Sequence, residues 1–140
     1  MTNRNDVLLD THVLLWLMNG DSELSVNIKD LIKEACKESL LCVSAISFWE
    51  IALLESKGRI SLNMPVDLWA KKVLSLLYVK VIDLNHTIAI ESCRLPGEFH
   101  GDPADRMIVA TSRLLNLPLL TRDQKILDYS SLSFIKAIKC

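Results

Sequence analysis

The sequence predicts a single α/β domain in which helices cover both faces of a parallel sheet. Short apolar runs alternate along the chain with longer segments of helical periodicity, an alternation typical of parallel strands joined by right-handed crossovers. The runs are apolar throughout, which indicates strands buried on both faces. The 140 residues contain no repeat, linker or low-complexity block, so residues 1–140 are expected to form one domain.

In the first half of the chain, helix start and stop signals follow each apolar run. Gly20 and Gly58 stand where helices should stop, since glycine is favoured just past a helix end. Ser25 can cap a second helix, and Pro65 stands where a first helical residue is tolerated. The expected elements are strands at 7–10 and 40–43, and helices at 13–18, 26–38, 44–57 and 66–77.

The second half repeats the pattern with shorter elements. Asn85 can cap a helix that Pro96 and Gly97 break, and Pro103 begins the next helix. A last apolar run at 132–135 is the candidate fifth strand, so the sheet has four or five strands. The expected elements are strands at 79–82, 117–121 and 132–135, and helices at 85–94 and 103–116.

The charge is nearly balanced, with 16 basic and 17 acidic residues. This balance argues against avid, non-specific nucleic-acid binding, which is typical of strongly basic domains. Asp6 and Asp10 interrupt the only apolar stretch that could serve as a signal peptide, and no uncharged stretch is long enough to cross a membrane. Four cysteines without metal-site or redox spacing indicate a reducing cytoplasm: Cys36, Cys42, Cys93 and Cys140.

Four acidic residues that are far apart in the sequence fall where predicted strands end and helices begin: Asp10, Glu50, Asp105 and Asp123. In a parallel α/β sheet these positions meet at the carboxyl edge of the strands. Carboxylates that gather there repel one another unless a cation neutralises them. The sequence therefore predicts a hard divalent cation held by oxygen ligands.

Asp10 and Glu50 each have a structural explanation as well. Asp10 could cap the helix that follows it, although Thr11 can also serve as the cap. Glu50 could complete a capping box with Ser47. If the helix begins at Ser44 instead, Glu50 lies inside it among bulky apolar neighbours, where a carboxylate needs a partner.

Asp102, Asp105 and Asp123 also stand at preferred helix-start or turn positions. Asp102 fits the cap before Pro103, which leaves Asp105 one turn further in as the better metal ligand. Asp102 could still contribute from outside the ligand set. Asp123 fits a cap or turn. Each structural explanation accounts for one residue, and none accounts for four acids at equivalent places in the topology.

Other polar and aromatic residues give weaker signals. The three histidines share no spacing that suggests a zinc site: His12, His86 and His100. His12 could contact a phosphate from the first turn of its helix. The tryptophans stand at apolar helical positions, which predicts core or partner-interface roles: Trp16, Trp49 and Trp69. Five basic residues could steer a polyanion, though solvated surface charges explain them better: Lys57, Arg59, Arg106, Arg113 and Arg122.

Four segments resemble the acidic motifs of PIN-domain nucleases, in the family's order. They are residues 8–12 (Leu-Leu-Asp-Thr-His), 44–51 (Ser-Ala-Ile-Ser-Phe-Trp-Glu-Ile), 101–111 (Gly-Asp-Pro-Ala-Asp-Arg-Met-Ile-Val-Ala-Thr) and 120–123 (Leu-Thr-Arg-Asp). The resemblance covers nearly the whole chain. Within the family the chain looks most like the VapC toxins of bacterial toxin–antitoxin pairs.

This resemblance implies a three-layer α/β/α sandwich and an endoribonuclease that depends on Mg²⁺ or Mn²⁺. It also implies RNA as substrate, a small antitoxin as inhibitor and a homodimer. The family's metal-binding roles carry over to Asp10, Glu50, Asp105 and Asp123. Asp102 matches a position that is acidic in this subgroup, and its role as ligand or only as helix cap stays open. We expect Asp10 and Asp105 to bind the principal ion, with Glu50 and Asp123 binding through water or holding a second ion.

The partner should bind through apolar surface on the segments 13–18 and 48–54, which are apolar on more than one face. One rival reading is a non-catalytic RNA-binding or scaffold domain on the same fold, and the complete set of acids argues against it. A second rival is a phosphoaspartate domain built on Asp10. That chemistry uses another aspartate two residues further on, where this chain has His12.

Overall fold

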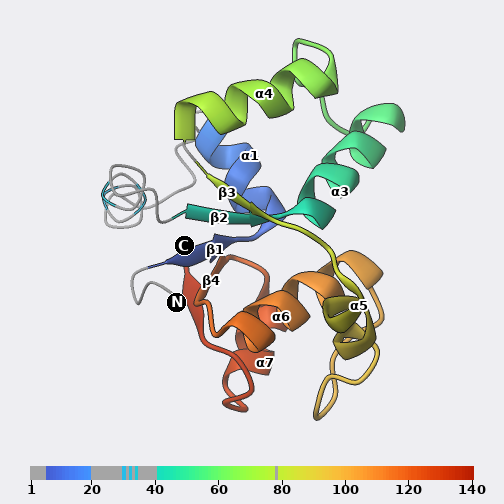
Figure 1. The fold of residues 1–140 in the computed structure, drawn as a ribbon, viewed down its shortest axis with the longest axis vertical. Coiled ribbons are helices and arrows are strands. Elements are labelled where there is room, and N and C mark those ends of the chain that lie inside the picture. The colour runs from blue at the N-terminus through green and yellow to red at the C-terminus, as the bar shows by residue number, and fades with distance from the viewer. Residues whose placement is uncertain (1–5, 20–29, 31, 33, 35–40, 78) are drawn as a thin grey trace.

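The computed structural model describes residues 6–19, 30, 32, 34, 41–77 and 79–140 (Figure 1). Several predictions lie outside the described residues: the stop at Gly20, the cap at Ser25, most of the helix at 26–38, and Cys36. Strand residue 40 lies outside them too.

Five parallel strands form one sheet with the order β3-β2-β1-β4-β5. The prediction of a parallel sheet is confirmed. The first strand in sequence lies at the centre, and Leu9 on it pairs with Val43 on one side and Leu120 on the other. The strands are β1 (Val7–Leu9), β2 (Leu41–Ser44), β3 (Lys80–Ile82), β4 (Leu119–Thr121) and β5 (Ala137–Lys139).

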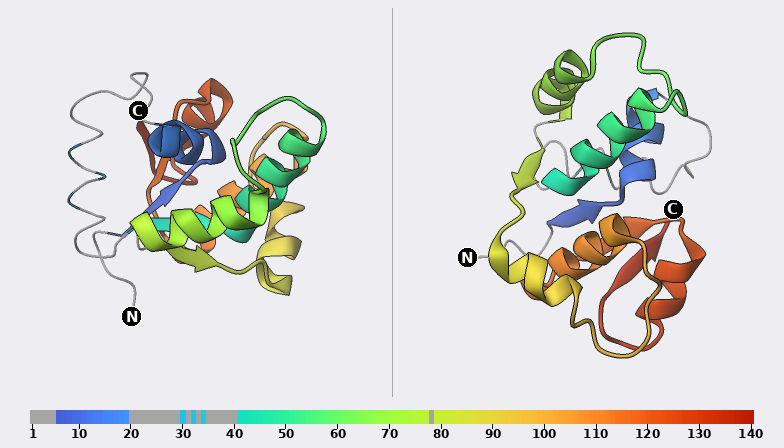
Figure 2. Two further views of the ribbon diagram at one scale, coloured as in Figure 1. Left: turned by 90° about the horizontal axis from the view of Figure 1, so that it is seen from above. Right: turned by 90° about the vertical axis from the view of Figure 1, so that its right-hand side faces the viewer.

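Helices cover both faces of this sheet, so the predicted three-layer sandwich is confirmed (Figures 1 and 2). One face carries α1 (Thr11–Asn19), α3 (Ala45–Ser56) and α4 (Val66–Leu77). The other carries α5 (His86–Ser92), α6 (Pro103–Leu115) and α7 (Gln124–Ser130). None of these described helices is long and apolar enough to cross a membrane.

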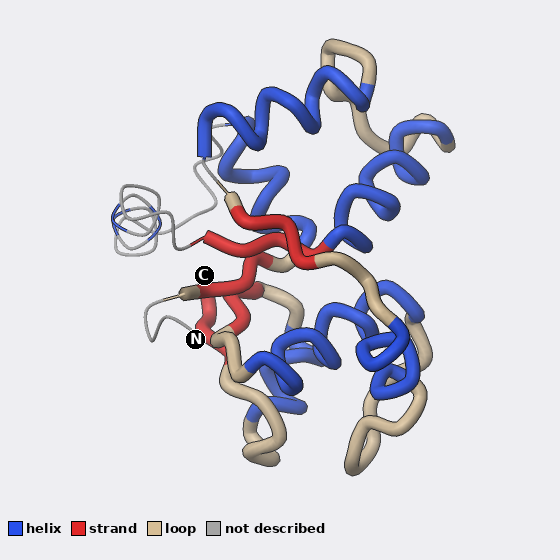
Figure 3. Tube along the Cα trace, in the orientation of Figure 1, coloured by secondary structure: helices blue, strands red, loops and turns tan. Residues whose placement is uncertain are grey.

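Alternate residues of the strands supply two separate cores. Leu9 and Leu120 are fully buried on the α1 side of the sheet, whereas Leu8 and Leu119 are fully buried on the α6 side. Successive side chains of a strand point to opposite faces, so a strand buried on both sides must be apolar throughout. Figure 3 shows the resulting arrangement, with the strands between two layers of helices.

The start of α3 decides between the two explanations offered for Glu50. Ser44 is the N-cap, and its side chain accepts a hydrogen bond from the Ile46 amide at 3.1 Å. Ser47 therefore lies inside the helix, and Glu50 lies in the second turn. The predicted caps Asn85 and Asp102 are also confirmed, each accepting a hydrogen bond from an amide in the first turn of its helix.

The last part of the chain differs from the prediction. Residues 132–135 form no strand, and the fifth strand is Ala137–Lys139. Leu132 is 52% exposed, and Ser133 has a positive φ of 70°, which interrupts an extended backbone. The helix α7 was not predicted, because its seven residues are too few to show a clear helical period.

The described cysteines are free thiols, as the sequence indicated. Cys42 and Cys140 are buried, and burial raises the pKa of each thiol to about 11. A thiol with so high a pKa is neutral and packs as a small hydrophobic group. Cys93 is exposed.

Candidate metal centre

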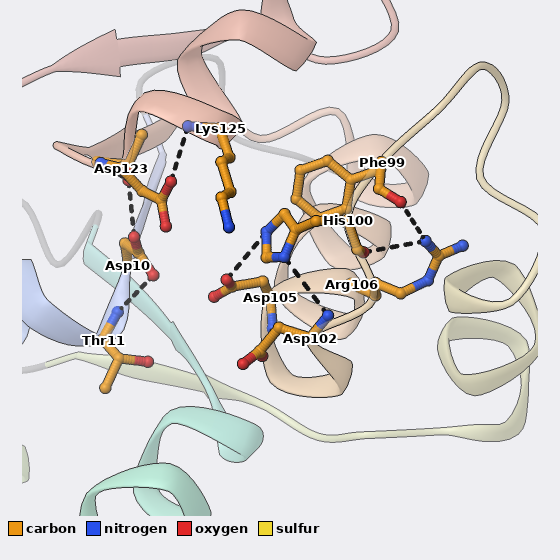
Figure 4. A network of polar contacts seen from close by, with 10 residues as sticks. Asp10, Thr11, Phe99, His100, Asp102, Asp105, Arg106, Asp123 and Lys125 are labelled. Atoms are coloured by element: carbon orange, nitrogen blue, oxygen red, sulfur yellow. Dashed lines mark hydrogen bonds and ion pairs between the residues drawn. The ribbon is translucent and has the colours of Figure 1, made fainter.

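The four predicted acids lie at strand ends or in the first two turns of helices, at one edge of the sheet. Asp10 directly follows β1, and Asp123 follows β4, the neighbour of β1. Glu50 stands in α3, which continues directly from β2, and Asp105 stands in the first turn of α6. Figure 4 shows Asp10, Asp105 and Asp123 facing one another across this edge. The predicted gathering of acids is therefore present.

Asp10 is 5% exposed and is held at both carboxylate oxygens. The Thr121 hydroxyl donates to Oδ2 at 2.7 Å, and the Thr11 amide donates to Oδ1 at 2.8 Å. Burial raises the pKa of Asp10 above its usual range, while the hydrogen bonds from Thr121 and Thr11 oppose the rise. The site thus confines a carboxylate in a poorly solvated position, which a nearby cation would stabilise in its charged form.

Thr121 also connects Asp10 to Asp123. The Thr121 hydroxyl accepts a hydrogen bond from the Asp123 amide at 3.0 Å and donates one to the Asp10 carboxylate. Asp123 is the N-cap of α7, and its Oδ1 accepts from the Lys125 amide at 2.8 Å. Asp123 therefore caps α7 and also lies at the edge of the sheet with the other acids. Its second carboxylate oxygen has no hydrogen bond to a described residue.

Glu50 is half-buried beside the same edge. Burial raises the pKa of its carboxyl, the negative charge of Asp10 adds to the rise, and contact with Thr11 opposes it. The Thr11 hydroxyl donates to Ser47 at 2.9 Å, which ties the start of α1 to α3. Glu50 therefore faces the other acids from the second turn of α3, while its neighbour Trp49 is 53% exposed.

The carboxyl of Asp105 lies among four other acids. Burial, followed by the charges of Asp10, Asp102, Asp123 and Glu50, raises its pKa from 3.8 to about 7. All four neighbours act in the same direction, so the repulsion predicted from the sequence is a property of the folded chain. Asp102 itself is exposed, and its Oδ1 caps α6 by accepting from the Asp105 amide at 3.0 Å.

His100 belongs to this cluster although the sequence analysis gave it no role. Its Nε2 lies 3.1 Å from Asp105 Oδ2, and its Nδ1 accepts weakly from the Asp102 amide at 3.4 Å. Nε2 is buried, yet its alignment with Asp105 is too poor for a hydrogen bond. No sequence motif identifies His100 as part of the site. Its position two residues before the cap of α6 was the one feature that could have predicted its place near Asp105.

Arg106 fixes the loop that carries His100. Its guanidinium donates to three backbone carbonyls: Ser92 at 2.7 Å, Phe99 at 2.9 Å and His100 at 3.2 Å. Figure 4 shows this side chain turned away from the acids and toward the loop. The earlier interpretation of Arg106 as a solvated charge or a polyanion contact is wrong, because these carbonyls occupy its donors.

Two other arginines on the list of basic residues are also engaged within the fold. Arg113 pairs with Glu91 at 3.2 Å and donates to the Phe134 carbonyl at 3.0 Å. The Arg122 guanidinium lies 5.1 Å from the centre of the Trp16 ring, the range of a cation–π contact. Lys57 and Arg59 are exposed, as solvated charges should be.

The donor set suits a divalent cation. Ligand atoms of His100, Asp105 and Asp123 all lie within 4.8 Å of one another, close enough to share one ion. Asp10 and Glu50 are not part of this three-residue set, and they act on Asp105 through their charges. Carboxylate oxygens are the preferred ligands of Mg²⁺ and Mn²⁺, and a cation would remove the repulsion that raises the pKa of Asp105. The residues present therefore fit the predicted metal.

Comparison with known proteins agrees with this geometry. Residues 7–132 match the family described as PIN domain. The chain is 35% identical to Ribonuclease VapC22 of Mycobacterium tuberculosis (strain ATCC 25618 / H37Rv) over 120 residues, 86% of this chain and 88% of that protein.

Two solved structures share the fold at low sequence identity. VapBC2 from Rickettsia felis, bound to a DNA fragment from its promoter, superposes with a TM-score of 0.70 at 15% identity, covering 96% of this chain and 98% of that one. DNA-bound VapBC from Salmonella typhimurium gives a TM-score of 0.68 at 18% identity, covering 96% and 97%. A further structure, described as a toxin–antitoxin complex from Klebsiella pneumoniae, superposes with a TM-score of 0.62 at 22% identity, covering 95% of this chain and 96% of that one.

Proposed function

The chain belongs to the PIN-domain family and is a VapC-type ribonuclease, and we propose that it cuts RNA with a divalent cation held by Asp10, Glu50, Asp105 and Asp123. It is the toxin of a type II toxin–antitoxin pair. The cytoplasm, where RNA is abundant and thiols stay reduced, is its proposed location.

One observation carries the proposal of a metal site. Burial, and after it the charges of Asp10, Asp102, Asp123 and Glu50, raise the pKa of Asp105 to about 7. A fold gains no stability from such repulsion, so the arrangement serves a ligand of opposite charge. Structural capping accounts for Asp102 and Asp123 but does not explain why Asp10 is buried and Glu50 half-buried beside them.

We assign Asp10 and Asp105 to the principal ion, with Asp123 and Glu50 binding through water or holding a second one. The ion is Mg²⁺ or Mn²⁺, and either supplies an activated water and neutralises charge on the phosphate oxygens. Asp102 supports Asp105 through the cap of α6, since one of its oxygens is already used there.

Neighbouring side chains keep these carboxylates in place. The Thr121 hydroxyl donates to the Asp10 carboxylate and accepts from the Asp123 amide, so one side chain holds both acids in place. His100 lies against one oxygen of Asp105 and leaves the other free to face the cluster. Partners of this kind restrict the motion of metal-binding groups and raise the affinity for the ion.

The partner of this chain is proposed to be a small antitoxin that covers exposed apolar side chains. On α1 the apolar residues are buried or half-buried, so the predicted segment 13–18 offers little free surface. Trp49 in the predicted segment 48–54 is 53% exposed, and α4 adds Leu68 at 50% and Leu76 at 55%. We place the antitoxin on α3 and α4, and retain the homodimer as a further proposal.

Substitution of Asp10 tests the proposed nuclease directly. Asp10→Asn keeps the shape of the side chain and removes the charge, so it should abolish metal-dependent RNA cleavage while circular dichroism shows an intact fold. Glu55→Gln is the matched control, because Glu55 is an exposed carboxylate on α3. Unchanged cleavage by Asp10→Asn would reject the assignment. Equal losses in both variants would show that the assay reports something other than the site.

A further inference from the structure

A pocket of about 380 Å³ opens beside the acid cluster, between the loop before α6 and the helix α7. It is lined by Glu98, Phe99, His100, Lys125, Asp128, Tyr129 and Leu132. We propose that this pocket binds one unpaired nucleotide of the RNA, next to the phosphate that is cut. The inference rests on the proposed nuclease function and names a part of the substrate site.

The walls of the pocket suit the flat aromatic face of a base. The Phe99 ring packs between His100 at 4.3 Å and Tyr129 at 5.0 Å, centre to centre. Tyr129 is only 2% exposed and supports the wall from behind, so the partly exposed rings of Phe99 and His100 supply the aromatic surface. Leu132 completes the lining with a side chain that is 52% exposed. Nucleobases stack on aromatic and apolar faces whatever their sequence, so the pocket requires only that the base be unpaired.

Rigid contacts hold these walls in place before any ligand arrives. The Tyr129 hydroxyl donates to the Pro96 carbonyl at 2.6 Å, which joins α7 to the loop. Arg106 donates to the carbonyls of Phe99 and His100. A preformed pocket loses little conformational entropy when a base enters it. The loop is therefore prepared to receive a base without rearrangement.

Lys125 supplies the charge that a nucleotide needs. Its side chain is exposed and makes no ion pair with any residue that the structure describes. Its amide is bonded to Asp123 and its side chain lines the pocket, so the residue adjoins both the pocket and the acid cluster; Figure 4 shows its side chain beside Asp123 and His100. A free ammonium group beside an apolar wall matches the phosphate and base of one nucleotide.

His100 is the wall shared by the two sites. Its Nε2 lies beside Asp105 in the metal cluster, while the residue also lines the pocket. A nucleotide whose base enters the pocket therefore has its phosphate close to the proposed metal. This continuity favours RNA over a peptide as the occupant. Asp128 Oδ1 already accepts from the Gln124 side chain at 2.7 Å, so Glu98 and the second oxygen of Asp128 can accept hydrogen bonds from amino groups of a base.

Binding of a fluorescently labelled, single-stranded RNA of mixed sequence tests the pocket without relying on cleavage. Anisotropy is measured in the presence of a chelator for the full chain and for Lys125→Ala and Leu132→Ala. Each should raise the Kd at least about fivefold, the loss expected for one stacked base or one phosphate contact. Leu114→Ala and Lys71→Ala, at exposed positions on α6 and α4, are matched controls and should leave the Kd unchanged.

A second arm places the nucleotide relative to the cut. A series of cleavable RNAs lacks the base at one position at a time. Removal of the base beside the cut should lower kcat/KM of the wild type several-fold and have little further effect on Leu132→Ala, because the variant has already lost the stacking contact.

Several results would overturn the inference. Pocket variants that bind RNA as well as the controls do would reject it, and so would equal losses from base removal in wild type and Leu132→Ala. Pocket variants that weaken only the antitoxin complex would assign the pocket to protein. By contrast, RNA affinity that depends on Lys125 and Leu132 in a chain that never cleaves RNA would reject the nuclease and keep the nucleotide pocket.

Discussion

Asp105→Asn should make the metal-free protein more stable at pH 8, although it removes a proposed ligand. The carboxylate of Asp105 is repelled by four neighbouring acids and is largely withdrawn from water. Asparagine has nearly the same shape and cannot ionise, so the variant avoids this cost. A residue that serves the fold alone would show the opposite sign.

The size of the effect follows from the pKa of Asp105, which rises from 3.8 to about 7. At 1.36 kcal/mol per pKa unit, ionising the carboxyl in the folded state costs about 4 kcal/mol. The side chain is 17% exposed, and salt screens part of the repulsion, so we reduce the expected gain to about 2 kcal/mol. For a domain of 140 residues this is about 6 °C in Tm.

The pH dependence has a definite sign. Below pH 3.8 the carboxyl is protonated in both the folded and unfolded states, and its contribution to stability is fully present. As pH rises toward 7 the folded state holds the proton more tightly, so the free energy of unfolding of the wild type falls. The advantage of Asp105→Asn should therefore be small near pH 4 and complete by pH 8.

Thermal unfolding in chelator at pH 4.5 and pH 8, followed by tryptophan fluorescence, measures the difference. Excess Mg²⁺ or Mn²⁺ at pH 8 should then reverse the order, because only the wild type keeps the full ligand set. Binding at 100 times the Kd adds about 2.7 kcal/mol. Glu55→Gln should behave as wild type throughout. If Asp105→Asn were the less stable protein in chelator at pH 8, the argument from charge repulsion would be wrong.

Two further substitutions test the side chains that hold the carboxylates. Thr121→Val removes the hydroxyl shared by Asp10 and Asp123 and should lower the affinity for Mn²⁺ roughly 10- to 100-fold in calorimetry; Thr111→Val, which loses only a bond to a carbonyl of its own helix, is the control. An equal loss in the two valine variants would contradict the role of Thr121. His100→Ala should weaken Mn²⁺ binding by a similar factor, whereas His100→Gln should recover part of it because its amide can reach Asp105. Failure of glutamine to improve on alanine would exclude positioning through that contact.

Much of this site was predictable because its acids stand next to recognisable local patterns. Asp10 ends an apolar strand, and Asp105 follows a Pro-containing helix start, so both could be placed at the carboxyl edge of the sheet. The position of Glu50 inside a helix followed from taking Ser44 as the helix cap, and the structure confirms that cap. Parallel strands align their carboxyl ends, and this rule converts sequence positions into a shared location.

Other features left no readable pattern. His100 joins the cluster because Arg106 holds its loop against α6, and neither residue shows a motif for that contact. The register of the last strand depended on Ser133, whose positive φ is atypical for serine. The seven residues of α7 span too few helical turns for a periodic pattern to be recognised in the sequence.

The sequence by itself determined the layered fold and the edge at which the acids gather, since strand burial, helix caps and chain order are local or rule-bound properties. Only the tertiary structure decided how strongly those acids interact and which groups hold them. Thr121 reaches Asp10 across 111 positions of sequence, and the pocket beside His100 is formed by two segments joined through Tyr129 and Pro96. Charge repulsion depends on the distances between the acids, and desolvation depends on their burial. Both quantities are fixed only when the chain has folded.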